Sequence, residues 1–206
     1  MLFTLYYNVH MSTLYKNIAA QRIAQLAVTQ QPLFHADDLA TLLGIQNDNT
    51  LRVTLHRLVR AGILHRVWRG LYSILPIETI DPIQLGSACL HQFCYLTTES
   101  VLRDSGYILQ SVDAVTFASG VSRKFAVRDH RFVSRRLHPR FLHNAAGIRK
   151  IDGVFRATPE RAIADMLYFH PQYHFDHSVD WKRVRSLQQT IGYPLTPRRY
   201  ADSASA

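Results

Sequence analysis

The chain of 206 residues has only two cysteines, Cys89 and Cys94, and it has no long hydrophobic run. Two cysteines are too few for a disulfide framework, so we expect reduced, buried thiols in a cytoplasmic protein. No apolar stretch approaches the roughly 18 residues that a membrane-spanning helix needs, so we expect no membrane partner. Acids are also scarce, because 15 of them face 24 lysines and arginines, a formal net charge of +9. This excess favours a polyanionic partner, although charge says nothing about the fold.

The sequence also lacks recognisable catalytic motifs, with no G-x-S-x-G, P-loop or G-x-G-x-x-G pattern. His170, His174, His177 and Asp180 are spaced four, three and three residues apart, as metal ligands can be. Pro171 interrupts the helix that this spacing would require. We therefore predict no metal, no cofactor and no enzymatic activity, with these histidines either satisfied by hydrogen bonds or at the surface.

The N-terminal residues 1–12 form an apolar and aromatic extension without the basic region or cleavage pattern of a signal peptide. Met11 is an alternative start, and the sequence leaves that choice open. Residues 14–28 have apolar side chains at near-helical spacing, which predicts a first helix. Leu33, Phe34 and His35 then predict a short strand.

Residues 34–75 carry the clearest pattern, which is two short helices followed by a hairpin. The first helix has its apolar stripe at Leu39, Leu42 and Leu43 and ends at Gly44, because glycine tolerates positive φ. The second helix follows possible caps at residues 47–49, ends at Gly62, and has its stripe at Leu51, Leu55, Leu58 and Val59. After Gly62 the period becomes two, with Gly70 at the tip. This order predicts a winged helix-turn-helix domain over residues 1–75.

The outward side chains of the second helix and the hairpin have the chemistry of duplex DNA recognition. A helix fits the major groove, where arginine pairs with guanine and asparagine with adenine. Residues 48–75 hold five arginines and one acid. The predicted contacts with double-stranded DNA are Asn49, Thr50, Arg52, Val53, His56, Arg57, Arg60, Arg66, Trp68 and Arg69. The alternative is a solvated basic face on a winged helix that contacts proteins.

Residues 76–206 are predicted to form a mixed α+β domain, so the fold class of the chain is α+β. We expect helices over residues 83–93 and 97–106, strands over 112–119, 124–128 and 131–137, and a hairpin over 148–156 that turns at Asp152-Gly153. Thr158-Pro159-Glu160 marks the start of a last helix. Within it, Asp165 is expected to be a structural hydrogen-bonding residue. The basic tail is expected to be flexible surface at Lys182, Arg183, Arg185, Arg198 and Arg199.

Nearly all of the net charge lies in residues 121–150, which hold nine lysines and arginines and one acid, Asp129. A second basic surface is predicted from Arg123, Lys124, Arg128, Arg135, Arg136, Arg149 and Lys150. On alternating strands, residues such as Arg123, Arg135 and Arg149 would share one face and follow a phosphate backbone. A generally basic surface with scattered counter-ions fits the pattern equally well.

Two groups of motifs carry a resemblance to a known family. They are DLATLLGI with LHRLVRAGILHRVWRGLYSI in the first half, and TTESVLRDSGYI with ATPERAIADMLY in the second. With them the chain resembles the AbiEi antitoxins of type IV toxin–antitoxin systems over residues 14–170. The extension and the tail after Tyr173 show no family pattern.

The resemblance implies a winged helix that binds inverted repeats and represses its own operon. It also implies a C-terminal domain, residues 76–206, that counteracts a nucleotidyltransferase-type toxin without a stable complex. The basic face would then suit RNA, a shared nucleic-acid target or an acidic toxin surface. The chain would be a monomer in solution or a dimer on a palindromic operator. The alternatives are a solitary transcriptional regulator and a protein-interaction scaffold.

Overall fold

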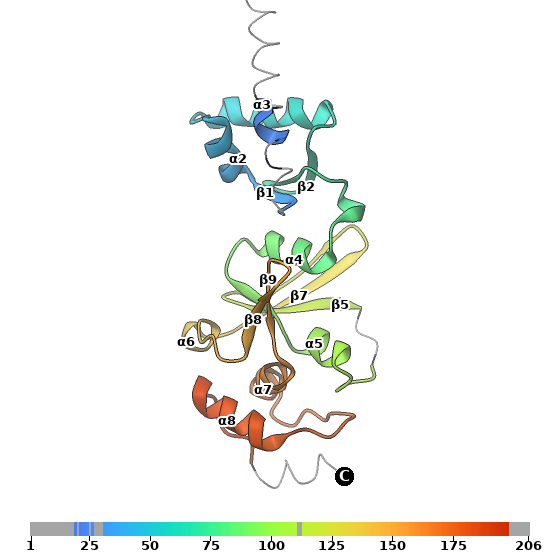
Figure 1. The fold of residues 1–206 in the computed structure, drawn as a ribbon, viewed down its shortest axis with the longest axis vertical. Helices are drawn as coiled ribbons and strands as arrows, with labels where there is room; N and C mark the ends of the chain where they lie inside the picture. The colour runs from blue at the N-terminus through green and yellow to red at the C-terminus, as the bar shows by residue number, and fades with distance from the viewer. Residues whose placement is uncertain (1–18, 20, 25, 27–30, 111–112, 198–206) are drawn as a thin grey trace, which may run out of the picture. The chain divides into compact units, whose positions relative to one another are not determined.

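The computed structural model describes residues 19, 21–24, 26, 31–110 and 113–197. It divides the chain into two compact units, Met1–Asp81 and Pro82–Ala206, whereas the predicted boundary followed Leu75. Helices and sheets occur in both units, which confirms the predicted α+β class (Figure 1). None of the helices in the described ranges is both long and apolar enough to cross a membrane.

The first unit contains a three-stranded antiparallel sheet in the order β1-β3-β2. Its elements are β1 (Leu33–His35), α2 (Ala36–Leu43), α3 (Asp48–Arg60), β2 (His65–Trp68), β3 (Leu71–Ser73) and the short 3-10 helix η1 (Ile77–Thr79). The predicted strand, two helices and hairpin are therefore present. Of the first predicted helix, residues 19, 21–24 and 26 are helical, and the rest lies outside the described residues, as does the extension 1–12.

Local signals explain where α2 begins and ends and where α3 begins. The His35 N–H donates to the Asp38 carboxylate at 3.1 Å, which satisfies one of the free amides before α2. Gly44 ends α2 with φ 69°, a conformation that favours glycine. The Asn47 side chain accepts a hydrogen bond from the Thr50 N–H at 3.0 Å and caps α3. The two helices are thus joined by a short turn, as the sequence predicted.

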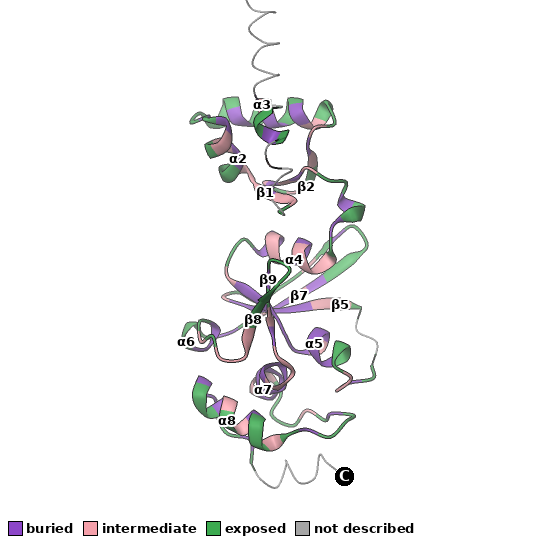
Figure 2. Ribbon diagram, viewed as in Figure 1, coloured by how far each residue is buried: buried purple, intermediate pink, exposed green. Residues whose placement is uncertain are grey.

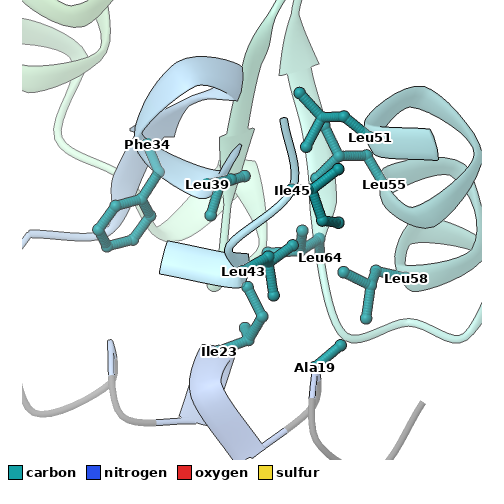
Figure 3. Packing of buried hydrophobic residues seen from close by; sticks show 10 residues of the cluster. All are labelled: Ala19, Ile23, Phe34, Leu39, Leu43, Ile45, Leu51, Leu55, Leu58 and Leu64. Atoms are coloured by element: carbon teal, nitrogen blue, oxygen red, sulfur yellow. The ribbon is translucent and has the colours of Figure 1, made fainter. Parts of the chain in front are cut away.

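The core of the first unit is a cluster of aliphatic side chains with one phenylalanine (Figure 3). The members are Ala19, Ile23, Phe34, Leu39, Leu43, Ile45, Leu51, Leu55, Leu58 and Leu64. α3 contributes Leu51, Leu55 and Leu58, which follow one side of the helix. Burying this side leaves the opposite side of α3 in solvent.

The second unit is built on a six-stranded mixed sheet in the order β6-β7-β5-β4-β9-β8. The β4–β9 and β5–β7 pairs are parallel, and the other three are antiparallel. Its elements are α4 (Pro82–Leu90), β4 (Cys94–Leu96), α5 (Glu99–Asp104), β5 (Ala114–Ser119), β6 (Arg123–Val127), β7 (His130–Arg136), α6 (Pro139–Leu142), β8 (Ile148–Ile151), β9 (Val154–Ala157), α7 (Pro159–Phe169) and α8 (Trp181–Ile191). Among them, β4, α6 and α8 were not predicted.

Helices cover both faces of this sheet. A Cβ atom at Gly86 of α4 would lie 2.5 Å from the Phe132 ring and 2.8 Å from the Phe117 ring, so α4 rests directly on one face. Thr116, the neighbour of Phe117 in β5, points to the other face, because side chains alternate along a strand. There it hydrogen-bonds Ser100 of α5 at 3.1 Å. α5 and α4 therefore lie on opposite faces of β5.

The expectation of a flexible basic tail is wrong for Lys182, Arg183 and Arg185, which lie in α8. The Asp180 side chain accepts a hydrogen bond from the Arg183 N–H at 3.1 Å and starts the helix. Val184 is fully buried, and α8 is anchored because Arg185 donates to the Thr196 carbonyl at 2.7 Å. The helix is amphipathic. The prediction of a flexible tail considered the basic residues of this segment and not its apolar side. Arg198 and Arg199 lie outside the described residues.

Candidate nucleic-acid interface

The outward side of α3 consists of polar and basic side chains. All seven α3 residues that were predicted to contact DNA are exposed: Asn49, Thr50, Arg52, Val53, His56, Arg57 and Arg60. Figure 2 shows α3 with buried and exposed residues alternating along its length. Val53 is unusual in this group, because an aliphatic side chain there is 43% exposed. The helix thus offers hydrogen-bonding groups and one apolar contact to a ligand.

The arginines of α3 keep their positive charge available. Within the described ranges, no carboxylate pairs with Arg52, Arg57 or Arg60. Arg52 donates instead to the Asn49 side-chain oxygen at 3.1 Å, a contact within the same outward face. The acid of the helix, Asp48, lies in its first turn, where it complements the helix dipole. A net positive, unpaired face suits phosphate or guanine.

The β2–β3 hairpin adds further basic groups to the same unit. Arg66 and Arg69 are exposed, and Trp68 is half-buried. The pairing shifts between Arg66, opposite Tyr72, and Trp68, opposite Leu71. Gly70 has φ 71° between the strands, the conformation that a tight turn requires. All ten predicted DNA-contact residues therefore lie in the first unit, and nine of them are exposed.

The second basic surface is not a single face, which corrects the expectation for Arg123, Arg135 and Arg149. The strand pairings run Arg149, Arg156, Leu96, Phe117, Ser134 and Arg123 in one row across the whole sheet. Paired residues project from the same side, so Arg123 and Arg149 share a face but occupy opposite edges. Arg135 follows Ser134 and therefore points to the other face. The pairing register of the strands decides from which face each arginine projects, and the sequence does not show that register.

The remaining residues of the predicted surface are also divided. Arg136 lies on the face of Arg123, whereas Lys124 and Lys150 lie on the opposite one. Arg128 occupies the turn between β6 and β7, with φ 50°. The charge is therefore spread over both faces and both edges, as in the alternative of a generally basic surface.

Arg135 is also neutralised by a carboxylate. Its guanidinium forms a two-pronged hydrogen-bonded ion pair with Glu99, and it donates to the Thr98 hydroxyl at 3.0 Å. Burial raises the pKa of the Glu99 carboxyl, but the hydrogen bonds and charge of Arg135 outweigh this and lower the pKa overall. The positive charge of Arg135 is thus compensated by Glu99 within the protein.

Asp165 is the centre of a buried hydrogen-bond network, which confirms its predicted structural role. It accepts from the Arg161 Nε at 2.9 Å, the Tyr95 hydroxyl at 2.9 Å, the Thr97 hydroxyl at 2.7 Å and the Tyr193 hydroxyl at 2.7 Å. Burial and the Asp165 charge raise the pKa of both phenols, so they stay protonated and donate. This carboxylate therefore accepts hydrogen bonds from four donors in the interior.

Arg161, the buried partner of Asp165, was not predicted from the sequence. Burial lowers the pKa of its guanidinium, but the negative charge and the hydrogen bond of Asp165, with the phenols beside them, together raise that pKa by more than burial lowers it. The pKa is therefore raised overall, and the residue stays cationic. Its remaining donors reach the backbone carbonyls of Phe141, Asn144 and Ala146 at 2.9, 3.0 and 2.8 Å. The spacing of four residues within α7 was visible in the sequence, but the burial was not.

The four residues near the tail that are spaced like metal ligands lie at the surface. Across the part of the chain that the structure describes, no three side chains of His, Cys, Asp or Glu are placed to hold an ion together. His170, His174, His177 and Asp180 are each exposed to solvent.

An aromatic group that was not predicted lies beside Lys150. The Phe93 ring is 5.2 Å from the Phe155 ring and 5.3 Å from the His143 ring, measured between centroids. Lys150 Nζ lies 5.8 Å from the centroid of Phe155. The Asp152-Gly153 turn was a usable signal, because a two-residue turn there places Lys150 opposite Phe155.

These features define an α+β protein with an exposed basic helix. No protein-family model and no curated protein matches the chain. Among solved structures, the chain is similar to the RV2827C protein from Mycobacterium tuberculosis, with a TM-score of 0.55 and 14% sequence identity. The similarity covers 91% of this chain and 76% of that protein. It shows a shared fold, and membership of the AbiEi family stays a prediction.

Proposed function

We propose that this protein is a transcriptional repressor that binds double-stranded DNA through a winged helix, with α3 in the major groove. The observation that carries the proposal is the outward face of α3, where Arg52, Arg57 and Arg60 are exposed and unpaired within the described residues. The order of α2, a short turn, α3 and the β2–β3 hairpin supports the winged-helix interpretation.

The roles of the side chains follow from their chemistry. Arg52 and Arg57 would contact base edges, because a guanidinium forms two hydrogen bonds with guanine. Asn49 would contact adenine, which a side-chain amide matches in the same way. Arg60, Arg66 and Arg69 would contact phosphates, and Trp68 would pack beside the backbone. Asn49 holds Arg52 at 3.1 Å in the free protein, which limits the freedom that Arg52 loses on binding.

A mobility-shift titration with DNA from upstream of its own gene tests this function. Binding should weaken steeply as salt rises, because phosphate contacts release counter-ions. Arg57→Ala should lose about 1–3 kcal/mol of binding free energy and relax specificity at one position. Lys182→Ala in α8 is the control for loss of one exposed positive charge. If wild-type protein bound no duplex, a protein-interaction scaffold would replace the repressor.

We further propose that the protein is an AbiEi-type antitoxin whose second unit counteracts a nucleotidyltransferase-type toxin. The motif ATPERAIADMLY supports this, and it spans residues 157–168, the end of β9 and most of α7. The test is coexpression with the product of a neighbouring reading frame of that class. The full chain carrying Arg52→Ala and Arg57→Ala should still restore growth, whereas failure of both chains would leave a solitary regulator.

A palindromic operator would bind two copies of the chain, because each half-site takes one helix. We therefore expect a monomer in solution and a 2:1 complex on DNA. Light scattering of the free and bound protein measures this ratio.

A further inference from the structure

The β8–β9 hairpin carries an aromatic ring and a lysine side by side at one edge of the six-stranded sheet. Lys150 and Phe155 are direct partners across the two strands, so both project from the same face. Phe155 is 37% exposed, and Lys150 is exposed as well. Figure 2 shows that most of this hairpin is in solvent. A partly exposed aromatic ring thus lies beside a cation.

Two further rings extend this feature into a small surface. Phe93, which precedes β4, is half-buried, and its ring contacts both Phe155 and the exposed His143. Three segments that are distant in sequence therefore bring their rings together. We call the set Phe93, His143, Lys150 and Phe155 the ring patch.

The cations of the β8–β9 hairpin differ in whether a carboxylate compensates them. No acid in the described ranges pairs with Lys150 or with the neighbouring Arg149. The third cation of the hairpin, Arg156, is held by Asp104 at 2.7 Å, so its charge is compensated. Asp152 is the hairpin's acid and lies at its turn. Among the described residues of the hairpin, Lys150 is thus the uncompensated cation on the face of Phe155, whereas Arg149 projects from the other face of the edge strand. An ammonium beside the rings suits a phosphate.

We propose that the ring patch binds single-stranded nucleic acid by stacking unpaired bases on its rings. Base–ring stacking tolerates any sequence, and the Lys150 ammonium next to the Phe155 ring is placed to meet the adjoining phosphate. In a duplex the bases are already stacked on each other, so their faces are not available to the rings, whereas unpaired bases offer theirs. This activity is separate from the proposed repressor function, since it uses other residues in the other unit.

The test uses fluorescence anisotropy with labelled oligouridine and oligothymidine of about 12 nucleotides. The parent protein is the full chain with Arg52→Ala and Arg57→Ala, so that α3 contributes less to the binding of the strands. Both strands should bind saturably, and preference for oligouridine would assign RNA as the ligand. Phe155→Ala should weaken binding about tenfold to hundredfold, while Phe155→Trp should retain it. Lys150→Ala should lower the salt slope by about 0.7.

Two control variants distinguish binding by the ring patch from non-specific binding to exposed apolar or basic side chains. Leu109→Ala removes another exposed apolar side chain, which is 75% exposed, and Lys182→Ala removes a distant positive charge. Neither should change binding, and circular dichroism should show Phe155→Ala folded. The proposal is overturned if the folded parent chain binds neither strand, or if Phe155→Ala binds them equally well.

Discussion

At the scale of single residues, the Asp165 carboxylate should matter most to stability, because four donors converge on it in the interior. Asp165→Ala leaves the Arg161 charge buried without its partner, so we expect a loss of about 3–5 kcal/mol in the free energy of unfolding. Asp165→Asn keeps the shape and should lose less. Urea denaturation measures both values.

The matched control for this prediction is an exposed ion pair. Arg183 lies 3.3 Å from Asp180, and its side chain is 73% exposed. Arg183→Ala should therefore change the free energy of unfolding by less than about 1 kcal/mol. Equal effects at the two sites would contradict the network's role.

Glu99 predicts how stability depends on acid. Arg135 lowers the pKa of the Glu99 carboxyl below its ordinary value of 4.5 despite burial, so the folded state favours the ionised form. This contribution is fully present above the unfolded pKa and is lost as the pH falls through the lower, folded pKa. The stability difference between wild type and Glu99→Gln should therefore shrink below pH 4.5. A difference that stayed constant down to unfolding would exclude this linkage.

At the scale of elements, α4 shows packing that outweighs helix propensity. Alanine favours a helix over glycine by about 1 kcal/mol. At Gly86, however, a methyl group would overlap the buried Phe117 and Phe132 rings. We expect Gly86→Ala to destabilise the protein by about 1–2 kcal/mol net in urea denaturation. The reverse change in the same helix, Ala88→Gly, should also destabilise, and an increase in stability for Gly86→Ala would refute close packing.

The exposed side of α3 leads to a prediction about base recognition, which depends on the proposed repressor function. Val53 is the apolar residue among the polar ones there, and a thymine methyl group is the apolar feature of the major groove. Replacing one operator thymine by uracil should weaken wild-type binding about fourfold, the value of one buried methyl group. Val53→Ala should be insensitive to that replacement. The control, Val121→Ala in the second unit, should respond as wild type does.

At the scale of the whole molecule, positive charge is distributed in two different ways. In the first unit it is concentrated on one helix and one hairpin, and the arginines of α3 have no carboxylate partner in the described ranges. In the second unit it is dispersed over both sheet faces, and part of it is compensated through Glu99 and Asp104. This division favours duplex recognition by the first unit and leaves smaller surfaces in the second.

Much of the local structure could be predicted because its signals lie within a few residues. The α2 and α3 boundaries follow from Asp38, Gly44 and Asn47, and the start of α7 follows from the Thr158 cap. The outward residues of α3 followed from its leucine stripe. The strand β4 was missed because Cys94–Leu96 is short and buried on both faces, so it shows no alternation of polar and apolar residues.

The sequence by itself determined the α+β class, the two helices before the hairpin and the exposed residues of α3, since periodicity and capping act over one or two turns of chain. Only the tertiary structure decided that Arg123 and Arg135 face apart, that Glu99 neutralises Arg135, and that Arg161 is buried beside Asp165. It also brought Phe93 to Phe155. These outcomes depend on the register and order of strands, which arise from pairing between segments that are far apart in the chain.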